Sequence, residues 1–201
     1  MPEERRTEIL DTAEALFVSR GYAKTTVNDI IQSIGVAKGT FYYYFKSKEE
    51  VMKAIVERVA ESVVATSKTI ASDPSLNAAE KLFRVITARP KDDKAELLEE
   101  LHGVDNAEMH LMSIKLGIVL ITPILAGIVE QGIREGIFKT QHPHEVMEIL
   151  LTSSQFLFDE GIFHWEPKEL ALKAKVFVES MEMLLGAQKG TFSYLYERIT
   201  S

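Results

Sequence analysis

Residues 38–48 read KGTFYYYFKSK and place three consecutive tyrosines between lysines. Phe41 and Phe45 are four positions apart, so on a helix they share one face, which we assign to the core. The tyrosines cannot all lie on that face, and at least two phenol groups must stay exposed. A tyrosine hydroxyl can donate to a phosphate oxygen, and its ring can contact a sugar or a thymine methyl group. The segment predicts a nucleic-acid-binding surface; the alternative is that the tyrosines only cover a small domain.

Cationic and hydroxyl groups accompany the tyrosines. Lys38 and Thr40 lie at the amino-terminal end of the expected helix, where residues meet base edges when a helix enters the major groove. Lys46 and Lys48 can neutralise phosphates beside it. Thr26 opens the preceding helix, and its hydroxyl together with the free backbone N–H groups behind it favours an anion.

Two short helices must position these groups. The first is expected to open at Thr26, because residues 26–29 have the form of a capping box with aspartate in the last position, and to end at Gly35. The second follows the turn at 35–37 and covers 38–45. Two helices joined by such a turn form a helix-turn-helix unit, whose second helix fits the major groove of duplex DNA.

The charge of the chain is distributed unevenly. Its net charge is −7, yet residues 20–48 carry five basic side chains against Asp29 alone. Residues 1–48 together have a net charge of +1, and residues 49–201 have a net charge of −8. An acidic chain with a basic segment near its amino terminus indicates that only this segment binds a polyanion. A mixed, solvated surface would account for the same charges.

Composition excludes several classes of protein. The 201 residues are 46% hydrophobic and 26% charged, which is typical of a soluble globular protein with one domain or two small ones. The absence of cysteine excludes a disulfide scaffold, a cysteine-ligated metal site and a thiol nucleophile. The opening MPEERRTEIL lacks the apolar stretch of a secretory signal, and the apolar run 116–129 is short for a membrane span and contains Pro123. We therefore expect a cytoplasmic protein with no membrane partner.

Apolar residues recur at helical spacing along nearly the whole chain, so the expected fold class is all-α. Besides the pair described above and a first helix that ends at Gly21, helices are predicted at about 48–70, 75–88, 94–102, 106–134, 144–161, 167–185 and 191–199. Pro123 should kink the longest of them. We expect a three-helix domain with the helix-turn-helix at 1–47 and a larger helical domain at 48–201, connected by the helix at about 48–70.

Three motifs stand at the front of the chain: GY at 21–22, TTVNDI at 25–30 and IGVAKGTFYYYFKSKEE at 34–50. In order, spacing and residue type they resemble the DNA-binding head of the tetracycline-repressor (TetR) family. The resemblance implies a homodimeric bacterial repressor that binds a near-palindromic operator in double-stranded DNA and is released by a small-molecule effector bound in the larger domain. One departure is Ala37, where serine or threonine is frequent and alanine caps a helix poorly.

Taken position by position, the resemblance assigns roles to individual residues. Those it implies to face DNA are Lys38, Gly39, Thr40, Tyr42, Tyr43 and Tyr44. It implies that Thr26 and Lys48 hold phosphates, and it implies a regulator without cofactor rather than an enzyme. The alternative is a helical-bundle enzyme or ligand-binding protein with a vestigial helix-turn-helix, although no nucleophile elbow, phosphate-binding loop or dinucleotide-binding glycine motif is present.

The larger domain offers apolar side chains for an effector pocket, since small-molecule sites have apolar walls with few polar groups. The candidates are Phe83, Met109, Met112, Phe156, Phe158 and Trp165. The alternative is that each is an ordinary core residue. His142 and His144 are clustered, but their spacing matches no metal-binding motif, so we expect no metal site.

The predicted helices 144–161 and 167–185 are strongly apolar. One stripe comprises Val146, Ile149, Leu150, Ser153 and Phe156. The other comprises Leu170, Ala174, Phe177, Val178, Met181 and Leu185. The resemblance implies that this helix pair builds a four-helix interface with the same pair of a second copy. The alternative is that one stripe is intramolecular core.

Overall fold

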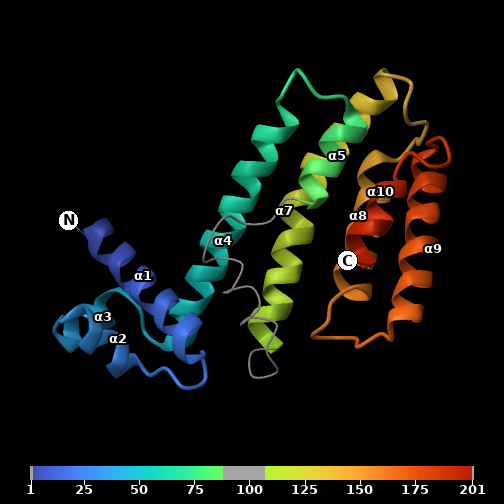
Figure 1. Ribbon diagram of the computed structural model, residues 1–201. Helices are drawn as coiled ribbons and strands as arrows, with labels where there is room; N and C mark the ends of the chain where they lie inside the picture. Colours follow the sequence, from blue (N-terminus) through green and yellow to red (C-terminus); the bar gives the residue numbers. More distant parts are fainter. Residues whose placement is uncertain (1, 88–106, 201) are drawn as a thin grey trace. The chain divides into compact units, whose positions relative to one another are not determined.

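A computed structural model describes residues 2–87 and 107–200, and this part of the chain is helical without a strand (Figure 1). The helices are α1 (Pro2–Arg20), α2 (Val27–Ile34), α3 (Lys38–Tyr44), α4 (Lys48–Ala71), α5 (Ala78–Thr87), α7 (Ala107–Arg134), α8 (Pro143–Leu157), α9 (Pro167–Leu185) and α10 (Ser193–Thr200). The all-α class is thus confirmed. The helix expected at 94–102 lies outside the described residues.

One helix end was predicted wrongly: α8 ends at Leu157 and does not continue to residue 161. The N–H of Phe158 still donates to the Ser154 carbonyl at 3.2 Å. The carboxylate of Asp159 then accepts a hydrogen bond from the N–H of Gly161 at 2.8 Å. A short polar side chain that bonds its own backbone two residues ahead favours a turn over a continued helix.

The three front helices enclose a small core of their own. Ile9, Ala13, Phe17, Ile30 and Phe41 have no exposed surface. They come from α1, α2 and α3, and the contacts between α1 and α2 are among the most extensive in the structure. Burying this many apolar side chains is what holds helices as short as α2 and α3, because isolated helices of this length are unstable in water.

Side-chain and glycine caps define the limits of α2. The Thr26 hydroxyl accepts from the N–H of Asp29 at 3.2 Å, and the Asp29 carboxylate accepts from the N–H of Thr26 at 2.8 Å, which completes the predicted capping box. Gly35 ends the helix at a φ of 74°, which side chains with a Cβ rarely adopt. In contrast, Ala37 gives α3 no side-chain cap, as the sequence predicted. The start of α3 therefore depends on packing.

The described residues divide into two compact units, 2–62 with 107–113, and 63–87 with 114–200. Helix α4 contributes to both, and the division falls after Ser62. In the first unit, α4 buries Val51, Met52, Ile55, Val56 and Val59. The predicted boundary after residue 47 marks the end of the helix-turn-helix, whereas packing extends the first unit by several turns of α4.

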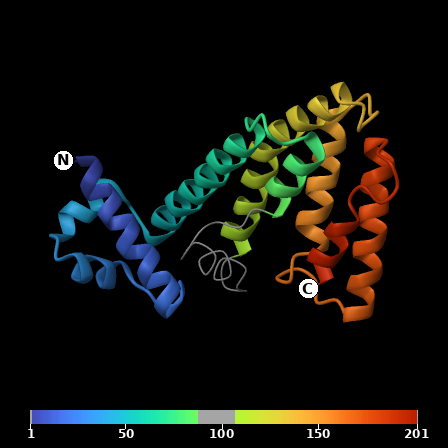
Figure 2. The same cartoon turned by 45° about the horizontal axis from the view of Figure 1, so that its top comes forward.

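The second unit has one continuous hydrophobic core. Helix α9 packs against both α8 and α10, and the three lie side by side in both views (Figure 1 and Figure 2). Side chains from α5, α7, α8, α9 and α10 meet in this core, among them Leu82, Leu125, Leu150, Met181 and Leu195. The carboxyl-terminal end of α4 packs against the same cluster.

A buried lysine ties three of these helices together. The ammonium of Lys81 on α5 donates to the Ala71 carbonyl at 2.7 Å and to the Gln131 side chain at 2.8 Å. Gln131 donates in turn to Glu135, and the other oxygen of Glu135 accepts from the N–H of Ala78 at 2.9 Å. Lys81 is 4% exposed, so this network satisfies a charge that would otherwise be costly to bury.

Helix α7 is the one helix of the described chain that is long and apolar enough to cross a membrane. Core helices of soluble proteins meet the same criterion. In this structure Ile121, Leu125, Ile128 and Val129 of α7 are buried in the second unit's core. Their burial shows that these apolar residues of α7 pack in the core.

Replacing Gly132 on α7 should destabilise the second unit. A Cβ at this position would lie 2.1 Å from the Phe138 ring and 2.9 Å from the Cβ of Ala78. Phe138 is itself 1% exposed and has little room to move. We expect Gly132→Ala to lower the free energy of unfolding by roughly 1–3 kcal/mol in urea titrations, despite a gain in helix propensity of about 1 kcal/mol.

Gly127 on the same helix supplies the control. A Cβ there meets nothing within 4 Å. Gly127→Ala should therefore leave the stability unchanged or raise it by up to about 1 kcal/mol. Equal stability of the two variants would show that the close approach of Phe138 and Ala78 to Gly132 does not affect the free energy of unfolding.

Candidate nucleic-acid interface

Helix α3 presents its tyrosines as the sequence predicted. Phe41 and Phe45 are 0% and 2% exposed, so one face of the helix belongs to the core. On the other side Tyr43 is 78% exposed and Tyr42 is 44% exposed. Tyr44 is half-buried, and its ring meets that of Tyr43 edge-on at 4.9 Å. The packed phenylalanines thus hold two phenol groups in solvent on a rigid helix.

The remaining predicted groups of α3 surround these tyrosines. Lys38 is exposed, and its ammonium lies 5.8 Å from the centre of the Tyr42 ring. Gly39 is exposed, and nothing lies within 4 Å of where a Cβ would stand, so another molecule could approach the backbone closely. Thr40 is half-buried, and Lys46 is exposed directly after the helix. The helix therefore combines cations, hydroxyls and aromatic rings on its accessible side.

Thr26 already has an intramolecular anionic partner. Its hydroxyl donates to the Asp29 carboxylate at 2.5 Å while accepting from the Asp29 N–H. These bonds, from the Thr26 side chain and backbone, hold the pKa of Asp29 below its ordinary value of 3.8. A phosphate at this helix end would have to share the hydroxyl with a carboxylate.

Lys48 reaches inward rather than outward. Its ammonium donates to the Tyr22 carbonyl at 2.7 Å and lies 4.1 Å from the centre of the Tyr22 ring. Burial, and then the neighbouring carboxylate of Glu49, raise the pKa of Tyr22 to about 12. Because an ammonium has three donors, a phosphate contact is still open to Lys48. The structure also shows that Lys48 joins α4 to the turn that follows α1.

Sequence reasoning missed the contacts that attach α4 to the front helices. Besides Lys48 with Tyr22, the guanidinium of Arg58 on α4 binds Asp11 and Glu14 of α1. These partners are 26, 47 and 44 residues apart in the chain. No local pattern links residues so distant, so only the folded chain shows the pairing.

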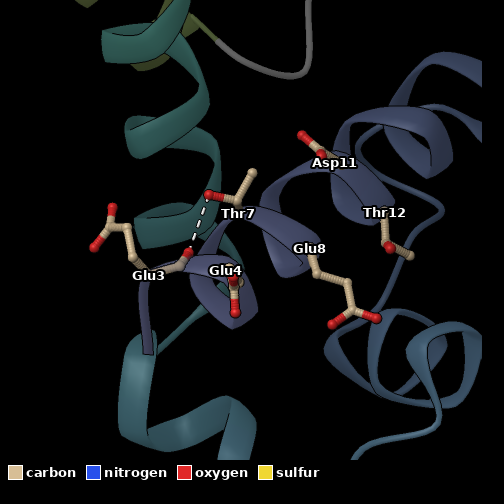
Figure 3. Close-up of a pocket in the computed structure, with 6 residues that line it drawn as sticks. All are labelled: Glu3, Glu4, Thr7, Glu8, Asp11 and Thr12. Atoms are coloured by element: carbon tan, nitrogen blue, oxygen red, sulfur yellow. Dashed lines mark hydrogen bonds between the residues drawn. The ribbon is translucent and has the colours of Figure 1, made fainter. Parts of the chain in front are cut away.

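A hollow of about 430 Å³ lies along the outer face of α1 (Figure 3). Its lining residues are Glu3, Glu4, Thr7, Glu8, Asp11 and Thr12. Four of these side chains are carboxylates, which repel a phosphate backbone. The hollow is therefore separate in chemistry from the cationic, aromatic side of α3.

The predicted effector-pocket residues divide between the two units. Met109 and Met112 belong to the first unit, and the other four belong to the second. Phe83 packs edge-on against Tyr194 at 4.5 Å, and Phe158 packs against Phe177 at 5.4 Å.

The last two candidates lie near the α8–α9 connection. The indole N–H of Trp165 donates to the Leu157 carbonyl at 2.7 Å, and its ring lies 4.8 Å from that of Phe163 and 3.8 Å from the Lys173 ammonium. Phe156 on α8 is half-buried. These contacts are those of packing residues, so a shared effector pocket is still a prediction.

Two hydroxyls in the second unit lack any hydrogen-bond partner. Ser67 on α4 and Thr122 on α7 are 1% and 2% exposed, and their side-chain oxygens bond to nothing. By contrast, Thr69 on α4 donates to the Ala65 carbonyl at 3.0 Å, which is how helical hydroxyls usually satisfy themselves. Buried unpaired hydroxyls cost free energy, and they are unusual enough to indicate a function.

The apolar stripes of α8 and α9 divide between core and solvent. The predicted α9 stripe is largely intramolecular, because Ala174, Val178, Met181 and Leu185 are buried. A second apolar stripe of α9, which the sequence analysis did not identify, comprises Leu172, Val176 and Met183 and is 51–74% exposed. On α8, Val146 and Leu150 are buried while Ile149 is 56% exposed. The exposed apolar surface of α9 therefore lies on the side of the helix opposite the predicted stripe.

His142 and His144 stand at the start of α8, and both are exposed. Within 2–87 and 107–200, no three residues among histidine, aspartate and glutamate are grouped as metal ligands.

A packed three-helix head with an exposed reading helix, followed by a separate helical unit, is the architecture of a helix-turn-helix transcriptional regulator. Residues 9–55 match the model of the bacterial regulatory proteins of the tetR family, and residues 93–180 match a tetracyclin repressor-like C-terminal domain. The chain belongs to the TetR family of transcriptional regulators.

Relatives agree with this assignment. The regulator EthR of Mycobacterium tuberculosis is 34% identical over 82 residues, which cover 41% of this chain and 38% of EthR. This match spans less than two-fifths of the relative's length. YhgD of Bacillus subtilis, named an uncharacterized HTH-type transcriptional regulator, is 27% identical over 187 residues, covering 91% of this chain and 95% of YhgD. These relatives are regulators, so the enzyme alternative is set aside.

Solved structures show the same fold. A TetR-family regulator from Syntrophomonas wolfei has a TM-score of 0.62 at 23% identity, covering 100% of this chain and 97% of its own. SmeT, the repressor of a multidrug efflux pump of Stenotrophomonas maltophilia, has a TM-score of 0.60 at 23% identity, with coverage of 93% and 92%.

The stability of the head should depend on pH through Asp29. Its pKa is lowered in the folded state, so its stabilising effect is complete above pH 3.8 and is lost as the pH falls through the lower folded value. We expect Asp29→Asn to be less stable than the parent at pH 7. The free energies of unfolding of the two proteins should become equal at acid pH, below the folded-state pKa of Asp29. Urea unfolding at several pH values measures this difference, and a constant difference across the range would contradict it.

Proposed function

We propose that two copies of this chain bind a near-palindromic operator in double-stranded DNA and that a small-molecule effector releases them. The observation that carries the proposal is the exposure of Tyr43 and Tyr42 on a helix anchored by buried Phe41 and Phe45. Such a helix fits the major groove, with Lys38, Gly39 and Thr40 at its leading end. Thr26, Tyr44, Lys46 and Lys48 complete the proposed contacts. A protein with this task acts on chromosomal DNA in the cytoplasm.

The charge distribution supports the same surface. The exposed cations of the first unit include Arg20, Lys24, Lys38 and Lys46, whereas the chain as a whole carries −7. Each phosphate neutralised by a lysine or arginine releases counterions, so binding should weaken as salt rises. An acidic protein without a local basic surface would be repelled by DNA.

Release by an effector requires coupling between the two units. Helix α4 is one continuous helix that begins beside the helix-turn-helix and contributes to both cores. A ligand that prefers a different packing of the second unit would shift α4 and disfavour the head separation that DNA selects, roughly 34 Å between reading helices or a multiple of it. Such coupling is typically about 1–3 kcal/mol and reciprocal between DNA and ligand.

The buried hydroxyls of Ser67 and Thr122 support an effector site in the second unit. Their neighbours along α4 and α7 pack in its apolar core, so a ligand there would be largely apolar and uncharged. A polar group on that ligand would satisfy a hydroxyl that now has no partner. We still propose the aromatic candidates of this unit as lining residues of the effector pocket: Phe83, Phe156, Phe158 and Trp165. The other two candidates, Met109 and Met112, belong to the first unit.

Tyr43→Ala should weaken binding to the specific duplex without unfolding the protein, because this side chain is exposed and packs into no core. We expect a loss of about 5- to 150-fold, measured by fluorescence anisotropy on a duplex that the parent protein selects from a random library. Tyr196→Ala on α10 is the matched control, since this tyrosine is exposed in the other unit. An unchanged affinity of Tyr43→Ala for the duplex would contradict the proposal that α3 binds DNA.

We propose that α8 and α9 form the interface between copies through the exposed stripe of Leu172, Val176 and Met183. Val176→Glu should convert the dimer into a monomer in sedimentation velocity experiments, because a charge at the centre of an apolar interface is left unpaired. Val119→Glu on α7 is the control, since Val119 is 59% exposed and Val176 is 51% exposed. A Val176→Glu protein that stays dimeric would place the interface elsewhere.

A further inference from the structure

One arginine of α4 holds two carboxylates of α1. The Arg58 guanidinium donates to Asp11 at 2.6 Å and, through its other terminal nitrogen, to Glu14. Asp11 and Glu14 are three positions apart, so they lie on one face of α1. The side chains of Arg58 and Glu14 are 27% and 13% exposed, whereas that of Asp11 is 62% exposed. The pair with Glu14 is therefore better protected from solvent than an ordinary surface ion pair.

The arrangement is not optimised for stability alone. The Nε of Arg58 is buried without a hydrogen-bond partner, which costs free energy that an apolar side chain of similar size would avoid. Partly buried ionic groups can specify one geometry while contributing little to stability. A planar guanidinium that binds two carboxylates fixes direction as well as distance.

Much of the contact between α4 and the head is apolar. Val51, Met52, Ile55, Val56 and Val59 are buried, but apolar contacts are non-directional. Lys48 contributes one directional contact, to the Tyr22 carbonyl at the start of α4. Arg58 contributes a second, roughly 15 Å further along the helix axis. Directional contacts at these separate points, at Tyr22 and at the carboxylates that Arg58 binds, set the rotation of α1 and the turn after it about α4.

We propose that Arg58 is a positioning residue for DNA binding: its contacts with Asp11 and Glu14 set the angle at which the helix-turn-helix is held on α4. The proposal rests on the proposed function, because the angle matters only if a pair of heads must match two half-sites. In a two-fold dimer a change of head angle changes the distance between the reading helices, and so the spacing of half-sites that is bound best.

The test measures spacing preference rather than affinity alone. A duplex selected by the parent protein from a random library is remade with its central spacer one or two base pairs longer or shorter, and a single half-site duplex is included. For Arg58→Met we expect about tenfold weaker binding at the selected spacing, little change at the altered spacings and unchanged binding to the single half-site. Lys53→Met, an exposed lysine of the same helix, is the control.

Three further variants separate geometry from charge. Glu14→Gln keeps the shape of the side chain and should flatten the spacing preference more than Asp11→Asn, because Glu14 is the more buried partner. The double variant Arg58→Glu with Glu14→Arg restores an opposite-charge pair and should recover part of the preference.

The outcomes distinguish the possible failures. A lower melting temperature with an equal loss of affinity at every spacing would make Arg58 merely structural and overturn the proposal, as would an unchanged spacing profile. If the parent protein selects no duplex at all, the proposed function fails instead. A flattened profile with an intact single half-site affinity supports the positioning role.

Discussion

The surface proposed to bind DNA depends on the burial of two phenylalanines. Helix α3 has seven residues and no side-chain cap, and a helix this short does not form alone in water. Phe41 of α3 and Phe45 directly after it supply the missing stabilisation, because they are 0% and 2% exposed and anchor α3 in the core of the head. The exposure of Tyr42 and Tyr43 is the geometric consequence, since consecutive residues of a helix point about 100° apart. The presentation of these tyrosines therefore depends on apolar packing on the opposite side of α3.

Apolar packing also determines how helix α4 is held in the structure. Its apolar residues hold it against the head, and the end of α4 packs in the core of the second unit. Apolar packing makes the helix part of both units, whereas polar contacts at Lys48, Arg58 and Lys81 determine direction. A change of packing in the second unit can act on the head only if the first part of α4 and the head move as one body. The polar contacts of α4 with Tyr22, Asp11 and Glu14 favour such joint movement.

Much of the fold could be predicted from the sequence, because helix limits are encoded locally. The capping box at Thr26, the glycine at 35 and the prolines at 143 and 167 each mark a helix end within a few residues of chain. The exposure of tyrosines on α3 followed from the four-residue spacing of Phe41 and Phe45. Pairings across long stretches of chain, such as Arg58 with Glu14, have no local signature. The inward direction of Lys48 was missed for the same reason, since its partner lies 26 residues away.

Helix α9 shows why an apolar pattern alone cannot locate an interface. It has apolar residues on two sides, and periodicity identifies both without saying which is covered. Only packing against α8 and α10 shows that Ala174, Val178, Met181 and Leu185 are used within the chain. The other stripe, with Leu172, Val176 and Met183, then needs a different explanation, because contiguous exposed apolar side chains in a soluble protein mark interaction sites. We propose a second copy of the chain as the partner of this face, since one patch that meets itself about a two-fold axis gives the symmetry that the proposed near-palindromic operator would require.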